Sequence, residues 1–203
     1  MEGVNMNEDI SNGDISNEDK RPLNEPLVWI DLETTGLSAE NDTILEIACI
    51  LTDGSLERII EGPNIIIHKP KEVLRKMDHW CLNQHASTGL IEECLKSTLN
   101  TQDAEQQLMQ FILPYVPNAK FGILSGSSVH FDKEFLRKEM PTLFNHLHYR
   151  IVDVTTVGEL TKRWFPTVLR RRPRKRGNHR ALDDIRDSIR ELQFYKENVF
   201  RMR

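Results

Sequence analysis

The chain has 203 residues and a formal net charge of −4. This length fits one full-sized domain and is short for two, and no apolar run approaches the roughly 20 residues of a membrane-spanning helix. The three cysteines form no CxxC pair, which argues against a disulfide framework and a zinc site.

Charge is spread unevenly along the chain. Residues 1–25 carry seven acids and two basic residues and almost no large apolar side chain, so we expect a disordered acidic N-terminal tail. Residues 26–203 are nearly neutral and should form one folded domain. Because the acidic start is the opposite of an Arg-rich transit peptide, we expect a cytoplasmic protein, with a mitochondrial or nuclear pool as alternatives.

The folded part begins with three short apolar segments. Residues 27–33, 43–53 and 57–70 read as strands, and turn residues separate them. Strands this close in sequence predict an antiparallel meander.

Helices and strands alternate after the meander. Apolar spacings of three and four indicate helices, with Thr101 or Asp103 as the cap of one of them, and short apolar runs indicate buried strands. The expected elements are helices at 72–85, 87–99 and 104–116, a strand at 120–127, a helix at 130–140, a strand at 149–156, and helices at 157–165 and 181–200. This order predicts an α/β fold with a mixed sheet, an antiparallel meander plus parallel strands, flanked by helices.

The first strand carries two acids on one face. Val28, Ile30 and Leu32 alternate with Asp31 and Glu33, so the acids point away from the expected core side. Two uncompensated carboxylates beside a core are costly.

Two further acids come from later elements. Asp132 follows the fourth strand at the start of a helix, and Asp184 lies near the start of the last helix. Each acid alone is explained as well by a turn or by the helix dipole. Together the four acids could converge, and a set of oxygen ligands suits two Mg²⁺ or Mn²⁺ ions. Such a pair of ions activates a water molecule and stabilises the attacking and leaving oxygens when a phosphodiester is hydrolysed.

A histidine stands close to the last acid in the sequence. His179 precedes Asp184 by five residues and is expected at the helix entry, with Asn178 as a possible cap. An imidazole there could accept the proton of an attacking water.

Three motifs occur in order: DLETTG at 31–36, SSVHFDKEFL at 127–136 and HRALDDIRDSI at 179–189. They resemble the motifs of the DEDDh 3′-to-5′ exonucleases of the ribonuclease H-like superfamily. Within that group the chain resembles the oligoribonuclease family from about residue 26 onward. The resemblance implies that residues 26–203 are an exonuclease domain that binds Mg²⁺ or Mn²⁺. The implied metal ligands are Asp31, Glu33, Asp132 and Asp184, and the implied general base is His179.

The resemblance also implies a substrate site. Leu37 and Trp80 match the residues that bracket the bases, and stacking on an aromatic ring reads no sequence. Ser128, Arg150 and His85 match the polar residues that close the site over a 5′ phosphate. A fixed 5′ end would select dinucleotides and other short RNA.

Two positions extend this comparison. Thr155 stands where the family has a serine, which keeps a hydroxyl for a phosphate contact. Family members are homodimers in which a tyrosine reaches the neighbouring site, and Tyr149 occupies that position.

The expected function is therefore 3′-to-5′ exoribonuclease activity that degrades short oligoribonucleotides, especially 5′-phosphorylated dinucleotides, to 5′-mononucleotides. The alternatives are a general DEDDh exonuclease on longer RNA or DNA ends and a non-catalytic nucleic-acid-binding protein. The basic run at 170–176 is denser than this function needs. It could raise the association rate of anionic substrates or serve as a localisation signal.

Overall fold

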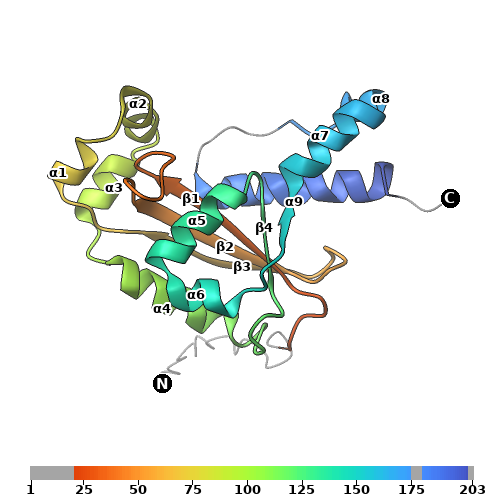
Figure 1. Cartoon of the computed structure of the whole chain (residues 1–203), viewed down its shortest axis with the longest axis horizontal. Coiled ribbons are helices and arrows are strands. Elements are labelled where there is room, and N and C mark those ends of the chain that lie inside the picture. Colours follow the sequence, from red (N-terminus) through yellow and green to blue (C-terminus); the bar gives the residue numbers. More distant parts are fainter. Residues whose placement is uncertain (1–20, 175–179, 201–203) are drawn as a thin grey trace, which may run out of the picture.

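A five-stranded sheet with the order β3-β2-β1-β4-β5 forms the centre of the protein, as seen in a computed structural model that describes residues 21–174 and 180–200 (Figure 1). β1 pairs antiparallel with β2 and parallel with β4, so the expected mixed sheet is confirmed. The strands are β1 (Leu27–Thr34), β2 (Ile44–Thr52), β3 (Ile59–Ile66), β4 (Ile123–Gly126) and β5 (Ile151–Asp153).

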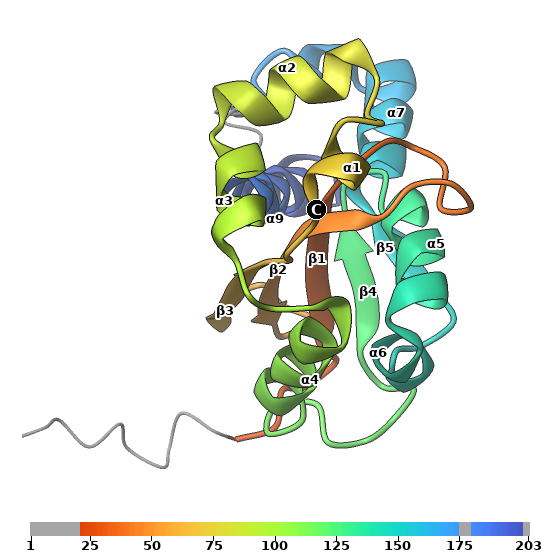
Figure 2. The same ribbon diagram turned by 90° about the vertical axis from the view of Figure 1, so that its left-hand side faces the viewer.

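Both faces of the sheet are covered by helices (Figure 2). Val28 and Ile30 pack in a core with residues of α4 (Thr101–Ile112), α5 (His130–Glu139) and α6 (Pro141–His146). Trp29, on the opposite face of β1, packs with residues of α9 (Ala181–Asn198) and is fully buried. The acids of β1 therefore share their face with a second core, because α9 covers it.

The helices depart from the sequence expectation in two respects. The helix expected at 72–85 is divided into α1 (Lys71–Leu74) and α2 (His79–Ser87), because the Asp78 side chain accepts a hydrogen bond from the Cys81 N–H and starts a new helix. α6 and α8 (Pro166–Leu169) were not expected. Both start at a proline, which fits the first position of a helix. The remaining helices are α3 (Leu90–Lys96) and α7 (Val154–Trp164).

Side-chain caps explain two differences between the predicted and the observed helix starts. α4 is capped by Asn100, whose side chain accepts the Asp103 N–H while the Asp103 carboxylate accepts the Asn100 N–H, so neither Thr101 nor Asp103 is the cap residue. The last strand ends at Asp153 and not at residue 156, because Asp153 caps α7 by accepting the Thr155 N–H.

Residues N-terminal to Pro26 already pack against the folded domain. Leu23 is buried, and its N–H donates to the Tyr115 carbonyl over 2.9 Å. The folded part thus includes residues N-terminal to Pro26, whereas residues 1–20 lie outside the described part. Within residues 21–174 and 180–200, no helix has the length and apolar character needed to cross a bilayer.

Candidate active site

Three carboxylates meet at the end of the sheet. Donor oxygens of Asp31 and Glu33, from β1, and of Asp184, from the first turn of α9, all lie within 4.8 Å of one another. The predicted convergence of these acids is observed because α9 packs across β1 with its N-terminus beside the strand's carboxyl end.

Asp132 lies next to this group without belonging to the set of three. It is in the first turn of α5, and its Oδ1 accepts the Leu32 N–H over 3.0 Å, between the two acids of β1. Its charge helps to raise the pKa of Asp31. The fourth acid is therefore an immediate neighbour of the strand that carries the first two.

The carboxylates are held where their charge is unfavourable. Burial, followed by the charges of Asp132, Asp184 and Glu33, raises the pKa of Asp31 well above its ordinary value. Burial is also the main cause that raises the pKa of Glu33 to about 8 and that of Asp132 to about 7. Such a cluster needs protons or cations to offset its charge.

A buried ion pair supports the cluster. Glu46 on β2 is opposite Glu33 in the strand register and is fully buried. Arg180, at the N-cap position of α9, donates to both Glu46 carboxylate oxygens over 3.0 to 3.2 Å and lies 2.8 Å from Glu93. Glu46 raises the pKa of Glu33 and Arg180 lowers it, so this pair adjusts the site's charge. Our sequence reasoning missed both residues, although an acid inside the apolar run of β2 was a visible signal.

The expected general base falls outside the described residues. His179 and Asn178 belong to residues 175–179, and α9 begins at Ala181. The N-cap position of that helix is occupied by Arg180. The possible cap Asn178 lies outside the described residues.

The two residues expected to bracket a base line one pocket. Leu37 and Trp80 are 79% and 66% exposed, and both border a pocket of about 470 Å³ that also includes Glu33. The loop that carries Leu37 is braced by Asp42, which accepts hydrogen bonds from the Ser38 N–H and the Thr35 hydroxyl. Two large apolar side chains thus face solvent beside the carboxylates.

His85 belongs to the same pocket and is almost fully buried. Its Nε2 lies 2.9 Å from the Thr34 carbonyl, and its Nδ1 lies 3.8 Å from a Glu33 oxygen. The structure therefore groups His85 with Glu33 and Trp80, whereas the other residues expected around the phosphate have different partners.

Ser128 and Thr155 form a separate polar group. The Ser128 hydroxyl donates to the Thr155 hydroxyl over 3.1 Å. One oxygen of Asp153 accepts both the Ser128 N–H and the Thr155 N–H over 2.9 Å, and the φ angle of Ser128 is 55°. Asp153 thus holds Ser128 in a left-handed conformation that non-glycine residues rarely adopt. Sequence reasoning missed Asp153, although an acid directly before a helix is a typical cap.

Tyr149 and Arg150 are exposed immediately before β5. The Tyr149 side chain is 70% exposed and stacks on the His148 ring at 4.4 Å. The Arg150 guanidinium lies 5.4 Å from the centre of the Tyr149 ring. Both side chains are accessible to a ligand or to another protein.

The donor set fits a hard divalent cation. Asp31, Glu33 and Asp184 offer only oxygens, which Mg²⁺ and Mn²⁺ prefer, and no sulfur donor belongs to the group of three. The raised pKa values of Asp31 and Glu33 show that the negative charge is otherwise poorly offset.

The fold of this chain is similar to that of solved exonuclease I structures. Exonuclease I from Methylocaldum szegediense superposes with a TM-score of 0.66 at 18% identity, over 87% of this chain and 41% of that one. An apo exonuclease I gives a TM-score of 0.64 at 16% identity, over 87% of this chain and 43% of the other. The chain thus spans less than half of these enzymes, and the likeness identifies the fold as ribonuclease H-like.

The sequence comparisons are more specific. The RNase T-type exonuclease family model matches residues 28–192. The human mitochondrial oligoribonuclease is 48% identical over 175 residues, 86% of this chain and 73% of the relative. The Arabidopsis thaliana oligoribonuclease is 44% identical over 196 residues (97% and 86%), and that of Vibrio parahaemolyticus 47% over 176 residues (87% and 96%). The chain belongs to the oligoribonuclease family of exonucleases.

Proposed function

We propose that this protein is a 3′-to-5′ exoribonuclease that hydrolyses short oligoribonucleotides, especially 5′-phosphorylated dinucleotides, to 5′-mononucleotides. The observation that carries the proposal is the position of the carboxylate group directly beside the pocket of Leu37 and Trp80. Glu33 belongs to both, so a base held in the pocket places its phosphodiester near the acids. The names of the family relatives support the same substrate class.

In this proposal, Asp31, Glu33, Asp132 and Asp184 bind two Mg²⁺ or Mn²⁺ ions. When bound, such a pair of ions lowers the pKa of water and stabilises the charge that develops on the departing oxygen. The buried sheet end fixes the acids, and Arg180 and Glu46 anchor the start of α9 against the strand that faces Glu33.

His179 is proposed as the general base. In the sequence it immediately precedes Arg180, the N-cap residue of α9, and it precedes Asp184 by five positions. An imidazole has an ordinary pKa near 6.5 and can take a proton from the attacking water at neutral pH.

The remaining residues are proposed to select the length of the substrate. Leu37 and Trp80 would hold the two bases, and Ser128, Thr155 and Arg150 would bind the 5′ phosphate. The hydroxyls of Ser128 and Thr155 already lie together, and the backbone of both is held by Asp153. His85 is proposed to contact the substrate from the pocket side, where it borders Trp80.

The direct test is hydrolysis of a 5′-phosphorylated diribonucleotide, followed by chromatography of the mononucleotides. We expect activity with Mg²⁺ or Mn²⁺ and none with EDTA. Asp31→Ala should abolish the activity while circular dichroism shows a retained fold. Full activity of Asp31→Ala would falsify the proposal and would favour a non-catalytic nucleic-acid-binding protein.

A second assay distinguishes the proposed function from that of a general exonuclease acting on longer RNA or DNA ends. An exonuclease for longer ends would turn over an RNA or DNA of about 20 nucleotides at least as fast per 3′ end as the dinucleotide. We expect the dinucleotide to be hydrolysed faster, because a bound 5′ phosphate leaves no room for further nucleotides. Faster turnover of the longer strand would exclude the short-substrate proposal.

We also propose that the protein is a homodimer in which Tyr149 reaches the partner's site. The high exposure of Tyr149 is compatible with this role. Light scattering should give twice the mass of one chain. Asp31→Ala and Tyr149→Ala proteins should each be impaired alone, and co-refolded mixtures should regain activity, because a mixed dimer has one intact site. Mixtures without any gain would contradict the shared site.

The tail and the compartment are proposed on sequence grounds. We propose a disordered acidic tail that does not act in catalysis, and a cytoplasmic location. Deletion of residues 1–20 should leave dinucleotide hydrolysis unchanged, whereas a loss of activity would contradict this. Cell fractionation with an antibody against the protein tests the location, and a purely mitochondrial or nuclear signal would contradict it.

A further inference from the structure

The end of the molecule formed by α7 and α8 carries a strongly basic surface. We define the basic surface by exposed side chains of the end of α7 and of the segment after α8, namely Lys162, Arg163, Arg170, Arg171 and Arg174. Glu159 pairs with Arg163, and residues 160–180 contain no acid. Within the described residues, no carboxylate forms an ion pair with Arg170, Arg171 or Arg174, so the surface keeps a net positive charge.

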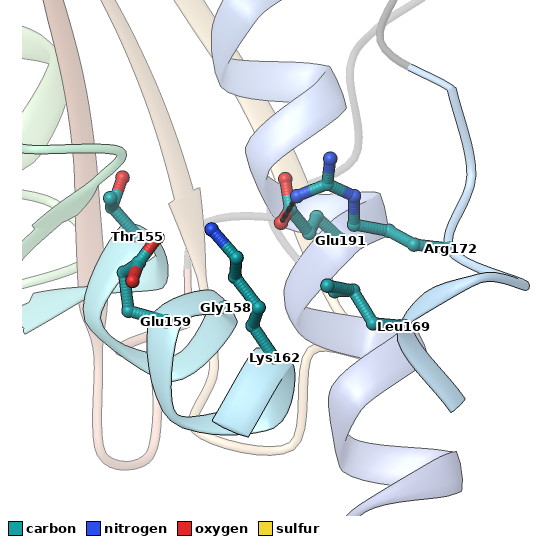
Figure 3. A pocket seen from close by; sticks show the side chains of 7 residues that line it. All are labelled: Thr155, Gly158, Glu159, Lys162, Leu169, Arg172 and Glu191. Carbon is teal, nitrogen blue, oxygen red and sulfur yellow. Dashed lines mark hydrogen bonds and ion pairs between the residues drawn. The ribbon is translucent and has the colours of Figure 1, made fainter. Parts of the chain in front are cut away.

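Arg172 differs from the arginines around it. Its guanidinium donates to Glu191 of α9 over 3.0 Å, and Glu191, which is only 5% exposed, also accepts the Tyr195 hydroxyl over 2.7 Å. This contact borders a pocket of about 430 Å³ between α7 and α9 (Figure 3). Arg172 therefore anchors the segment to the domain, and its neighbours in the sequence point to solvent.

The basic surface is separate from the carboxylate group. Glu191, where the segment is anchored, follows Asp184 by seven residues, which is about 10 Å along an α-helix. α7 and α8 project at the end of the molecule opposite to α2, which carries Trp80 (Figure 1). Lys162 borders the same pocket as Thr155, whereas Arg170, Arg171 and Arg174 do not line it, so a dinucleotide at the acids and Trp80 does not need these three arginines.

We propose that the basic surface binds single-stranded RNA longer than a dinucleotide by its phosphates, independently of catalysis. Closely spaced like charges repel one another, and a polyanion relieves that repulsion by neutralising them. Trp164, 65% exposed and adjacent to Arg163, offers an aromatic face on which a base can stack. An acidic protein segment would satisfy the charges but would not use that ring. The surface would keep the protein near RNA whose decay releases short fragments.

The test compares two charge-matched variants of the full-length protein. The surface variant is Arg170→Gln, Arg171→Gln and Arg174→Gln. The control variant is Lys71→Gln, Arg75→Gln and Lys120→Gln, which removes the same charge from exposed residues elsewhere that have no ion pair in the described part of the chain. Fluorescence anisotropy in EDTA measures binding of a labelled RNA of about 20 nucleotides without hydrolysis.

We expect the surface variant to bind this RNA at least about tenfold more weakly near 0.1 M salt and the control variant to stay within about threefold of the wild type. The slope of log affinity against log salt should fall by about 2 in the surface variant, because each lost phosphate contact removes roughly 0.7. Dinucleotide turnover in Mg²⁺ should stay within about twofold.

Three results would overturn the proposal. The first is a surface variant that binds the RNA as the wild type does. The second is an equal loss in the control variant, which would mean that net charge alone controls binding. The third is tighter binding of a polyglutamate peptide of similar length than of the RNA, which would identify a protein-binding surface.

Discussion

Arg180 holds the fully buried Glu46 through hydrogen bonds to both carboxylate oxygens, at the point where α9 meets β2. Glu46 stands opposite Glu33 in the strand register, so the ion pair lies next to the carboxylate group. Asn64 also donates to Glu46 over 2.8 Å, and the Arg180 guanidinium supplies the positive charge of this ion pair. One ion pair therefore fixes both the start of α9 and the electrostatics of the site.

Arg180→Gln should lower the free energy of unfolding by about 3 kcal/mol, because it leaves the buried Glu46 without its ion-pair partner. The double variant Glu46→Gln, Arg180→Gln should recover most of that loss. Urea denaturation of the metal-free proteins measures both. Equal destabilisation of the single and double variants would show that the side chains matter through packing and not through their charges.

Asp31→Asn should make the metal-free protein more stable and inactive. The substitution removes a carboxyl group whose ionisation is disfavoured by burial and by the neighbouring carboxylates, so the melting temperature in EDTA should rise by several degrees at pH 8. Mg²⁺ should then stabilise the variant less than the wild type. The control is Asp103→Asn, in the capping box of α4, which should respond to Mg²⁺ as the wild type does. An unchanged Mg²⁺ response in Asp31→Asn would exclude Asp31 as a ligand.

The stability of the metal-free protein should fall as the pH rises. The pKa of Glu33 is raised from 4.5 to about 8 and that of Asp132 from 3.8 to about 7, so the folded state binds more protons than the unfolded state between these values. This contribution is fully present below about pH 4 and is lost as the pH rises through 7 and 8, with a slope of about 1.4 kcal/mol per pH unit for each group.

Thermal unfolding in EDTA at pH 5, 6.5 and 8 tests this dependence. Glu33→Gln should remove part of the decline, and saturating Mg²⁺ should reduce it in the wild type. A melting temperature that is constant or rises from pH 5 to pH 8 would mean that these carboxyls are ionised at no cost in the folded protein.

Trp80→Ala should weaken substrate binding without loss of stability. Base stacking on an aromatic ring contributes about 1–3 kcal/mol, so KM for the dinucleotide should rise roughly 5- to 150-fold with little change in kcat. Trp80 is 66% exposed, and its removal leaves no cavity. Trp164→Ala is the matched control, since Trp164 is 65% exposed and lies outside the pocket. An equal KM in both variants would show that Trp80 does not belong to the substrate site.

Asp153→Ala should affect the 5′ phosphate and the fold together. The side chain caps α7 and holds the N–H groups of Ser128 and Thr155, so stability should fall by about 1–2 kcal/mol. KM should rise more for a 5′-phosphorylated dinucleotide than for the unphosphorylated one. Asp103→Ala, which removes part of the α4 capping box, should cost similar stability without that difference. The same KM ratio in both variants would contradict a phosphate site at Ser128 and Thr155.

Short-range patterns predicted much of this structure. The alternation of apolar residues with Asp31 and Glu33 placed both acids on one face of β1. The spacing of apolar residues located α4, α5 and α9 to within a few residues. The starts of the helices were harder to predict from the sequence. Asn100, Asp78 and Asp153 are caps that depend on one or two side-chain hydrogen bonds each, and several polar residues near each helix start are equally suited to make them.

The sequence by itself determined which chemical groups are available: four acids in three motifs, Leu37 and Trp80 at the positions implied by the family resemblance, and a basic run without acids. Only the tertiary structure decided which groups meet. Asp184 reaches the acids of β1 because α9 crosses the sheet, and Glu46 and Arg180, 134 positions apart, form one ion pair. It also divided the basic run into the anchored Arg172 and its exposed neighbours. Contacts between distant segments follow from how helices pack on the sheet, which no local pattern encodes.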